Sequence, residues 1–171
     1  MKVIFLDVDG VLNSDEFFDN NKDNSYIDEK TVRLVKKAVE ETGAKVVVSS
    51  SFRYKRSFGK VQEILLRNGI IFDKTPFLDN ERGKEIKQWI DEHSKISEEL
   101  KDGSEVEDYV VLDDDIFDDF DEEILSHLIK MKENEVRGFG KGLQEKDVDK
   151  IIERFGRTKN IVKNIVIEEE R

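Results

Sequence analysis

Residues 2–12 of the chain read KVIFLDVDGVL, and the interpretation of the remaining sequence starts from this stretch. Its first part, KVIFL at residues 2–6, is a short apolar run that predicts a buried strand. Asp7 and Asp9 follow directly, and Gly10 after them is a residue type that is common in turns. The sequence therefore places two carboxylates just beyond the end of a buried strand.

Downstream of this strand, apolar runs alternate with segments of helical periodicity. We expect further strands at residues 44–48, 70–72, 109–112 and 127–131, and helices at residues 29–42, 60–68, 84–93 and 145–155. Continuous apolar strands separated by amphipathic helices are typical of a parallel sheet that is covered on both faces. The predicted fold class is therefore α/β: a single three-layer Rossmann-like domain around a central parallel sheet of about five strands.

Length and composition agree with one domain, with a core over about residues 1–155 and a tail over residues 157–171. Of the 171 residues, 37% are hydrophobic, enough for one core, and 40% are charged, with a net charge of −11. Cysteine is absent, which excludes a disulfide framework, thiolate zinc sites and cysteine catalysis. Because no apolar run is long enough to span a bilayer or to form a signal-peptide core, we expect no membrane association and a cytoplasmic location.

Functional groups follow three of the predicted strands. They are Asp7 and Asp9 after the first strand, Ser49, Ser50 and Ser51 after the second, and Asp113, Asp114 and Asp115 after the fourth. Arg82 and Lys84 lie near the start of the helix between the third and fourth strands. Since ligands of parallel sheets bind outside the carboxyl ends of the strands, all these groups are expected at one edge.

Clustered aspartates at this edge predict a metal site. Like charges at close range repel each other, and a bound divalent cation removes that penalty. Mg²⁺ prefers oxygen ligands, often one or two carboxylates together with water and a substrate phosphate. Asp7, Asp9 and Asp114 could supply such a site.

Four segments resemble, in order, the motifs of the haloacid dehalogenase (HAD) superfamily. They are VIFLDVDGVLN at 3–13, VVVSSSFR at 46–53, ERGKEIKQWI at 81–90 and VVLDDDIFDD at 110–119. The first has Asp at both positions, as in the phosphatases of the superfamily. More narrowly, SSSFR, RGKEI with a Trp shortly after it, the LDDD strand end and a late GLQEKDV segment resemble small capless HAD domains grouped with Swiss Army Knife RNA-repair proteins. The resemblance covers residues 1 to about 155.

The resemblance implies a role for each aspartate. Asp7 would be the nucleophile that forms an aspartyl-phosphate, and Asp9 would be the general acid and base. Asp7, Asp114 and the main-chain carbonyl of Asp9 would hold Mg²⁺. Asp113 and Asp118 would support these groups from the surrounding hydrogen-bond network.

The resemblance also implies groups that bind the transferring phosphoryl group. Ser50 would hydrogen-bond it, because Phe52 two positions later fits the related pattern; Ser49 is the alternative. Arg82, just before a glycine and a helix start, would neutralise the developing charge, and Lys84 is the alternative.

Many HAD phosphatases carry a cap domain, inserted after the first or the third strand. Here residues 14–28 and residues 73–82 are too short to form one, so we expect an open site. An open site suits a large phosphorylated substrate, such as a nucleic-acid end.

The basic run Arg53, Lys55 and Arg56 beside the serines could hold a phosphodiester backbone, whereas the net charge of −11 argues against nucleic acid. A small-molecule phosphatase for nucleotides or sugar phosphates remains an alternative. So does a non-catalytic regulatory module that keeps the metal site, although such a module has no need of the general acid Asp9. The sequence gives no indication of the oligomeric state.

Overall fold

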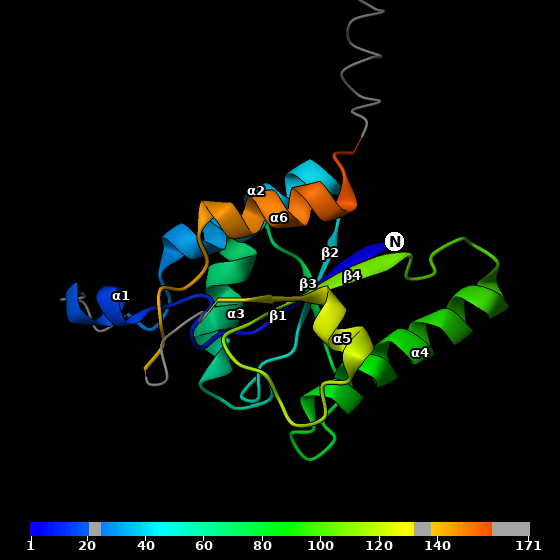
Figure 1. Ribbon diagram of the computed structural model, residues 1–171, viewed down its shortest axis with the longest axis horizontal. Helices are drawn as coiled ribbons and strands as arrows, with labels where there is room; N and C mark the ends of the chain where they lie inside the picture. Colours follow the sequence, from blue (N-terminus) through cyan, green and yellow to red (C-terminus); the bar gives the residue numbers. More distant parts are fainter. Residues whose placement is uncertain (21–24, 132–137, 159–171) are drawn as a thin grey trace, which may run out of the picture.

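The computed structural model describes residues 1–20, 25–131 and 138–158. In this part of the chain, strands and helices largely alternate (Figure 1). The strands are β1 (Lys2–Leu6), β2 (Lys45–Val48), β3 (Phe72–Lys74), β4 (Asp108–Asp113) and β5 (Leu128–Lys130). The helices are α1 (Asp15–Asn20), α2 (Glu29–Thr42), α3 (Phe58–Arg67), α4 (Arg82–Leu100), α5 (Glu122–His127) and α6 (Glu145–Phe155).

The five strands form one sheet in the order β3-β2-β1-β4-β5, and every pair is parallel. In the central strand β1, Leu6 is in register with Val48 of β2 and with Leu112 of β4. The carboxyl ends of these three strands are therefore level. The prediction of a single α/β fold around a parallel sheet is confirmed.

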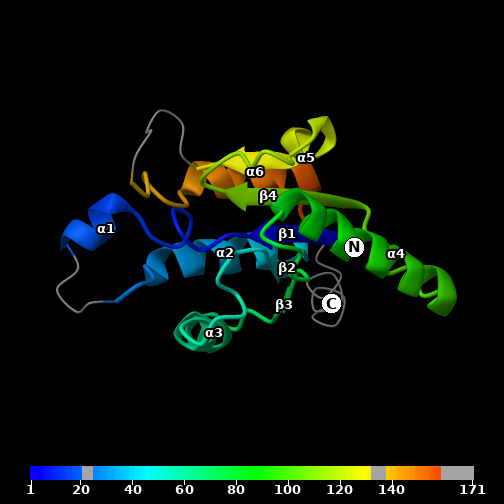
Figure 2. The ribbon, with the colours of Figure 1, turned by 90° about the horizontal axis from the view of Figure 1, so that it is seen from below.

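Helices cover both faces of the sheet, as expected for three layers (Figures 1 and 2). Leu6 and the other side chains of one face pack against α2, α3 and α6 in one hydrophobic cluster. Phe5 and the alternate side chains pack against Ile86 and Trp89 of α4 and Ile124 of α5 in a second cluster. The alternation follows from the two-residue period of a strand.

Several predicted bounds are accurate because local signals set them. Helix α2 begins after Asp28, whose side chain accepts a hydrogen bond from the main-chain nitrogen of Lys30 at 3.0 Å. It ends at Gly43, which has a φ of 70° in the left-handed region. By contrast, α4 starts two residues before the prediction and continues to Leu100, and β3 begins at Phe72 rather than at residue 70.

No helix within residues 1–20, 25–131 and 138–158 is long and apolar enough to cross a membrane. The predicted tail at 157–171 lies almost entirely outside the described residues. Of the two segments where a cap could be inserted, residues 14–28 contain the short helix α1, and residues 73–82 connect β3 to α4. Helix α1 lies beyond the carboxyl end of β1 in both views (Figures 1 and 2).

Candidate active site

Three aspartates meet where β1 and β4 end. Asp7 directly follows β1, and its main-chain nitrogen donates to the carbonyl of Leu112 at 3.0 Å, which continues the pairing of the two strands. Asp113 is the last residue of β4, and Asp114 follows it. One carboxylate oxygen from each of Asp7, Asp113 and Asp114 lies within 4.8 Å of the other two. We call these three residues the aspartate cluster.

Arg82 at the start of α4 is the cation of this cluster. Its Nη1 atom lies 2.6 Å from Oδ2 of Asp113 and 3.4 Å from Oδ1 of Asp7, and all three side chains are buried. Lys84, the alternative, is exposed and pairs with Glu81 at 2.6 Å. Of the two cations suggested by the sequence, the structure brings Arg82 to the aspartates.

The aspartate cluster carries more negative charge than Arg82 offsets. Burial, followed by the nearby Asp113 carboxylate, raises the pKa of Asp7 well above its usual range, while Arg82 acts in the opposite direction. Burial and the neighbouring Asp113 raise the pKa of Asp114 to about 6. Closely spaced, repelling carboxylates with only oxygen atoms to offer fit a hard divalent cation such as Mg²⁺.

The turn that follows Asp7 packs tightly against Asp114. Gly10 has a φ of +75°, and a Cβ atom at this position would lie 2.5 Å from the Cβ of Asp114. The main-chain nitrogen of Gly10 donates to Oδ1 of Asn13 at 2.7 Å, and Nδ2 of Asn13 donates to the carbonyl of Tyr26 at 3.2 Å. Only glycine fits this place, because it combines a left-handed φ with the absence of a side chain.

Asp9 lies on this turn, half-buried, and its carboxylate accepts a hydrogen bond from the hydroxyl of Tyr26. Burial and the bond to Asp9 raise the pKa of Tyr26 well above its usual range, so the hydroxyl keeps its proton and remains a donor. Sequence reasoning missed both Tyr26 and Asn13. Asn13 lies within the first motif, where its side chain had no assigned role.

The serines after β2 lie beside Asp7, since the main-chain nitrogen of Ser49 donates to the carbonyl of Leu6 at 2.9 Å. Ser49 and Ser50 are both buried. The hydroxyl of Ser49 has no hydrogen-bond partner in the described part of the chain, whereas that of Ser50 accepts from the main-chain nitrogen of Phe52 at 3.5 Å. Both serines remain candidates for contact with a phosphoryl group.

The loop after β4 fixes the start of α4 and therefore Arg82. Asp119 accepts hydrogen bonds from the main-chain nitrogens of Gly83 at 3.0 Å and Lys84 at 2.9 Å. A Cβ atom at Gly83 would lie 2.5 Å from the carbonyl oxygen of Asp119. Asp118, predicted to support the site, is exposed, and this supporting position is occupied by Asp119 instead.

The predicted basic run does not form one surface, which corrects the expectation for Arg53. Its guanidinium is fully buried, pairs with Glu85 at 2.9 Å and donates to the carbonyls of Ser50 and Thr75. A buried arginine with these partners cannot contact a substrate. Lys55 and Arg56 alone are exposed.

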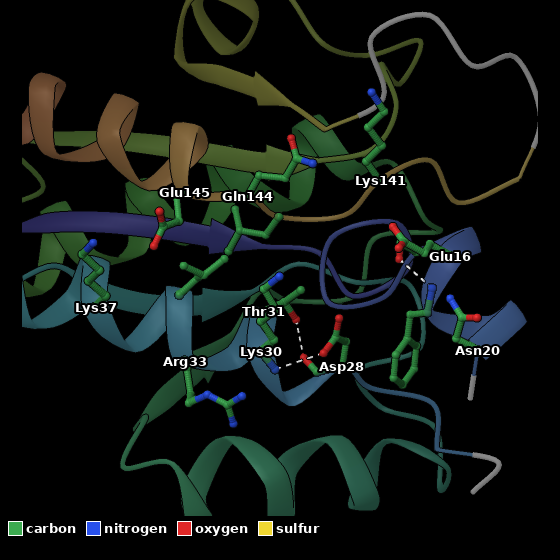
Figure 3. A pocket seen from close by; sticks show the side chains of 14 residues that line it. Glu16, Asn20, Asp28, Lys30, Thr31, Arg33, Lys37, Lys141, Gln144 and Glu145 are labelled. Carbon is green, nitrogen blue, oxygen red and sulfur yellow. Dashed lines mark hydrogen bonds between the residues drawn. The ribbon is translucent and has the colours of Figure 1, made fainter. Parts of the chain in front are cut away.

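A large groove of about 1190 Å³ lies apart from the aspartate cluster, between α1, α2 and the loop before α6 (Figure 3). None of the aspartates of the predicted metal site lines it. Both signs of charge line it, and Lys141 and Arg33 extend in opposite directions in Figure 3. The charged lining residues are Lys30, Arg33, Lys37 and Lys141 together with Glu16, Asp28 and Glu145. This mixed charge gives no consistent site for an anion, so the aspartate cluster is the candidate active site.

Comparison with known proteins adds one match. The family model described as the HAD domain in Swiss Army Knife RNA repair proteins matches residues 3–148. The match covers every residue of the aspartate cluster, together with Arg82. Searches of curated proteins and of solved structures returned no match.

Proposed function

This chain belongs to the family of HAD domains found in Swiss Army Knife RNA repair proteins, and on that premise we propose that it is a Mg²⁺-dependent phosphatase. The observation that carries the proposal is the aspartate cluster with Arg82 between Asp7 and Asp113. A carboxylate that can attack phosphorus lies there beside a cation that can offset the charge of a phosphoryl group.

In the proposed reaction, an oxygen of Asp7 attacks phosphorus while the bond from phosphorus to the leaving oxygen breaks. Asp9 donates a proton to the leaving oxygen. In the second step Asp9 accepts a proton from water, which attacks the same phosphorus and displaces the Asp7 carboxylate. Phosphate leaves, and both aspartates return to their starting states.

The groups that would hold Mg²⁺ are Asp7, Asp114 and the main-chain carbonyl of Asp9. Asp113 is assigned to orientation, because its Oδ2 is engaged by Arg82 at 2.6 Å and its Oδ1 accepts from the main-chain nitrogen of Asp115 at 3.2 Å. When bound, the ion supplies positive charge that the cluster lacks and helps to neutralise the transferring group.

We propose a phosphorylated nucleic-acid end as the substrate. The family description names RNA repair, and neither residues 14–28 nor residues 73–82 are long enough to form a cap. A large substrate can therefore approach the edge of the sheet. Lys55 and Arg56 are the exposed cations of the predicted basic run that remain available to it.

The test is turnover of a generic aryl phosphate with Mg²⁺ and with a chelator, followed by a comparison of phosphorylated oligonucleotide ends with mononucleotides and sugar phosphates. We expect Mg²⁺-dependent turnover that Asp7→Asn abolishes and that the control Asp118→Asn leaves intact. Preference for mononucleotides or sugar phosphates would replace the nucleic-acid substrate with a small molecule. Mg²⁺ binding without turnover of any phosphate would leave a non-catalytic metal-binding module.

A further inference from the structure

A line of aromatic rings crosses the edge of the sheet beside Asp9. The ring centroids of Phe139 and Phe18 are 5.2 Å apart, those of Phe18 and Tyr26 5.8 Å, and those of Tyr26 and Phe52 6.0 Å. These rings come from α1, from the segment before α2, from the loop after β2 and from the loop before α6. Three regions that are distant in sequence, around residues 18–26, 52 and 139, thus bring aromatic side chains to one place.

Tyr26 is the ring of this line that reaches the proposed reaction site. Its hydroxyl donates to the Asp9 carboxylate, and Asn13 of the same turn donates to its main-chain carbonyl. The side chain is nevertheless 43% exposed, whereas the aromatic residues of the core, such as Phe5, are buried. Part of the Tyr26 ring is therefore open to solvent and accessible to a ligand, at a position where its hydroxyl already contacts Asp9.

Two cationic side chains follow one of these rings in the sequence. Lys55 and Arg56 follow Phe52 in the turn between β2 and α3, and both are exposed. Neither forms an ion pair with any residue that the structure describes. The turn places them close to Phe52 along the chain, since the main-chain nitrogen of Lys55 donates to the carbonyl of Phe52 at 2.9 Å. Stacking rings with nearby cations are the combination by which proteins bind single-stranded nucleic acid.

We propose that Tyr26, flanked by Phe18 and Phe52, forms a stacking site for the nucleobase of the nucleotide whose phosphate reacts at Asp7. The hydroxyl end of the ring lies at Asp9, and the ring extends from there away from the reacting residues. A base one sugar away from the reacting phosphate can therefore reach it. The inference rests on the proposed function for the identity of the reacting group.

Binding to an inactive protein tests the stacking site. In the Asp7→Asn background with Mg²⁺, the affinity is measured for two oligonucleotides whose phosphorylated terminal nucleotide either carries a base or is abasic. We expect the oligonucleotide with the base to bind about 5-fold more tightly or better, because about 5-fold is the smallest gain in affinity expected from stacking one base on an aromatic ring. Tyr26→Leu, which keeps apolar bulk against Phe18, should bring this ratio close to one. Tyr26→Phe, which keeps the ring and loses the hydroxyl, should preserve it.

The matched control is Phe77→Ala. Phe77 is 55% exposed in the loop after β3, but it takes part in none of the ring contacts, so the ratio should stay unchanged. A ratio that Tyr26→Leu leaves intact, or that Phe77→Ala lowers equally, overturns the proposal. The same affinity ratio can be measured for a free mononucleotide and the corresponding base-free sugar phosphate. If it equals the ratio for the oligonucleotides, the stacking site is supported, and the base is recognised without the rest of the strand.

Failure of the proposed function would look different. If the protein hydrolyses no phosphate, but Tyr26→Leu alone removes base-dependent binding, the stacking site is supported and the phosphatase activity is refuted. A protein that hydrolyses phosphates but binds base-carrying and abasic ends equally is a phosphatase without the stacking site.

Discussion

Arg82 determines the charge balance of the buried aspartates. It contacts Asp7 and Asp113, and the structure describes no other ion pair to either residue. The guanidinium also lies over the ring of Phe117, 4.2 Å from its centroid, which holds it in place. The site therefore depends on one arginine that is itself buried.

Replacing Arg82 with Ala should destabilise the metal-free protein by about 3–5 kcal/mol at neutral pH, because two buried carboxylates lose their partner. Urea unfolding measures the free energy. The control Lys84→Ala removes an exposed charge and should change stability by less than about 0.5 kcal/mol. Equal effects of the two substitutions would contradict the assignment of Arg82 to the cluster.

The stability of the metal-free protein should depend on pH through the titration of Asp114. Its pKa is raised in the folded protein to about 6 from 3.8, so the folded state holds this proton over a range where the unfolded state has lost it. The resulting stability is present at low pH and is lost as pH rises through about 6.

Asp114→Asn does not titrate, so its stability relative to wild type should increase as pH rises from about 4 to above 6. Urea unfolding in a chelator at several pH values provides the measurement. A difference between the two proteins that stays constant with pH would show that Asp114 is ionised in the folded state throughout.

The sequence predicted that Asp7, Asp114 and Arg82 would gather at one edge, because the aspartates follow strand ends and Arg82 lies near a helix start. The sequence could not show that Arg53 is buried, since its partner Glu85 is 32 positions away and no local pattern links them. The hydrogen bond between Tyr26 and Asp9 likewise joins residues 17 positions apart. Such pairs arise only when the chain folds.

At the scale of elements, the start of α4 carries Arg82 into the site. Asp119 accepts two main-chain hydrogen bonds there, and Gly83 allows the loop to approach. The first main-chain nitrogens of a helix have no hydrogen-bond partner within the helix, and a carboxylate placed there accepts from them. Its negative charge also interacts favourably with the positive end of the helix dipole.

Asp119→Ala should therefore destabilise the protein by about 0.5–2 kcal/mol, the range for loss of a helix cap. It should also lower turnover, because the position of Arg82 is no longer fixed. Asp118→Ala is the neighbouring control and should change stability by less than about 0.5 kcal/mol. If the two alanine variants have equal thermal stability, Asp119 does not anchor the helix.

Elements with strong local signals were predicted well, and short or polar ones were not. Strand β1 and helices α2 and α6 have the expected bounds. Helices α1 and α5 have six residues each, too few to show a helical period, and were missed. The second half of α4 is polar, so it lacks the apolar stripe by which a helix is recognised.

At the scale of the whole molecule, the sheet brings residues 7, 82, 113 and 114 together from three parts of the chain. The repeated alternation of strand and helix was enough to predict this meeting, because parallel strands end at one edge. Side-chain contacts across that edge depend on loop conformation, and the sequence did not determine them.

Mg²⁺ should stabilise the folded protein, because the aspartate cluster that we propose as its site exists only in the native state. At about 100 times its Kd the ion would add about 2.7 kcal/mol, visible as a higher melting temperature. Asp114→Ala should remove most of this increase, whereas Asp118→Ala should retain it. An unchanged Mg²⁺ response in the Asp114→Ala protein would place the ion elsewhere.

The most direct test of the account is to locate the transferred phosphoryl group. The protein is mixed with Mg²⁺ and an aryl phosphate, quenched in acid during turnover, digested, and analysed by mass spectrometry. We expect a phosphoryl group on Asp7 that is absent from the Asp7→Asn protein, whose turnover should fall by several orders of magnitude. Turnover of Asp7→Asn within about tenfold of wild type, or a phosphoryl group on another residue, would contradict the role of Asp7 as the nucleophile.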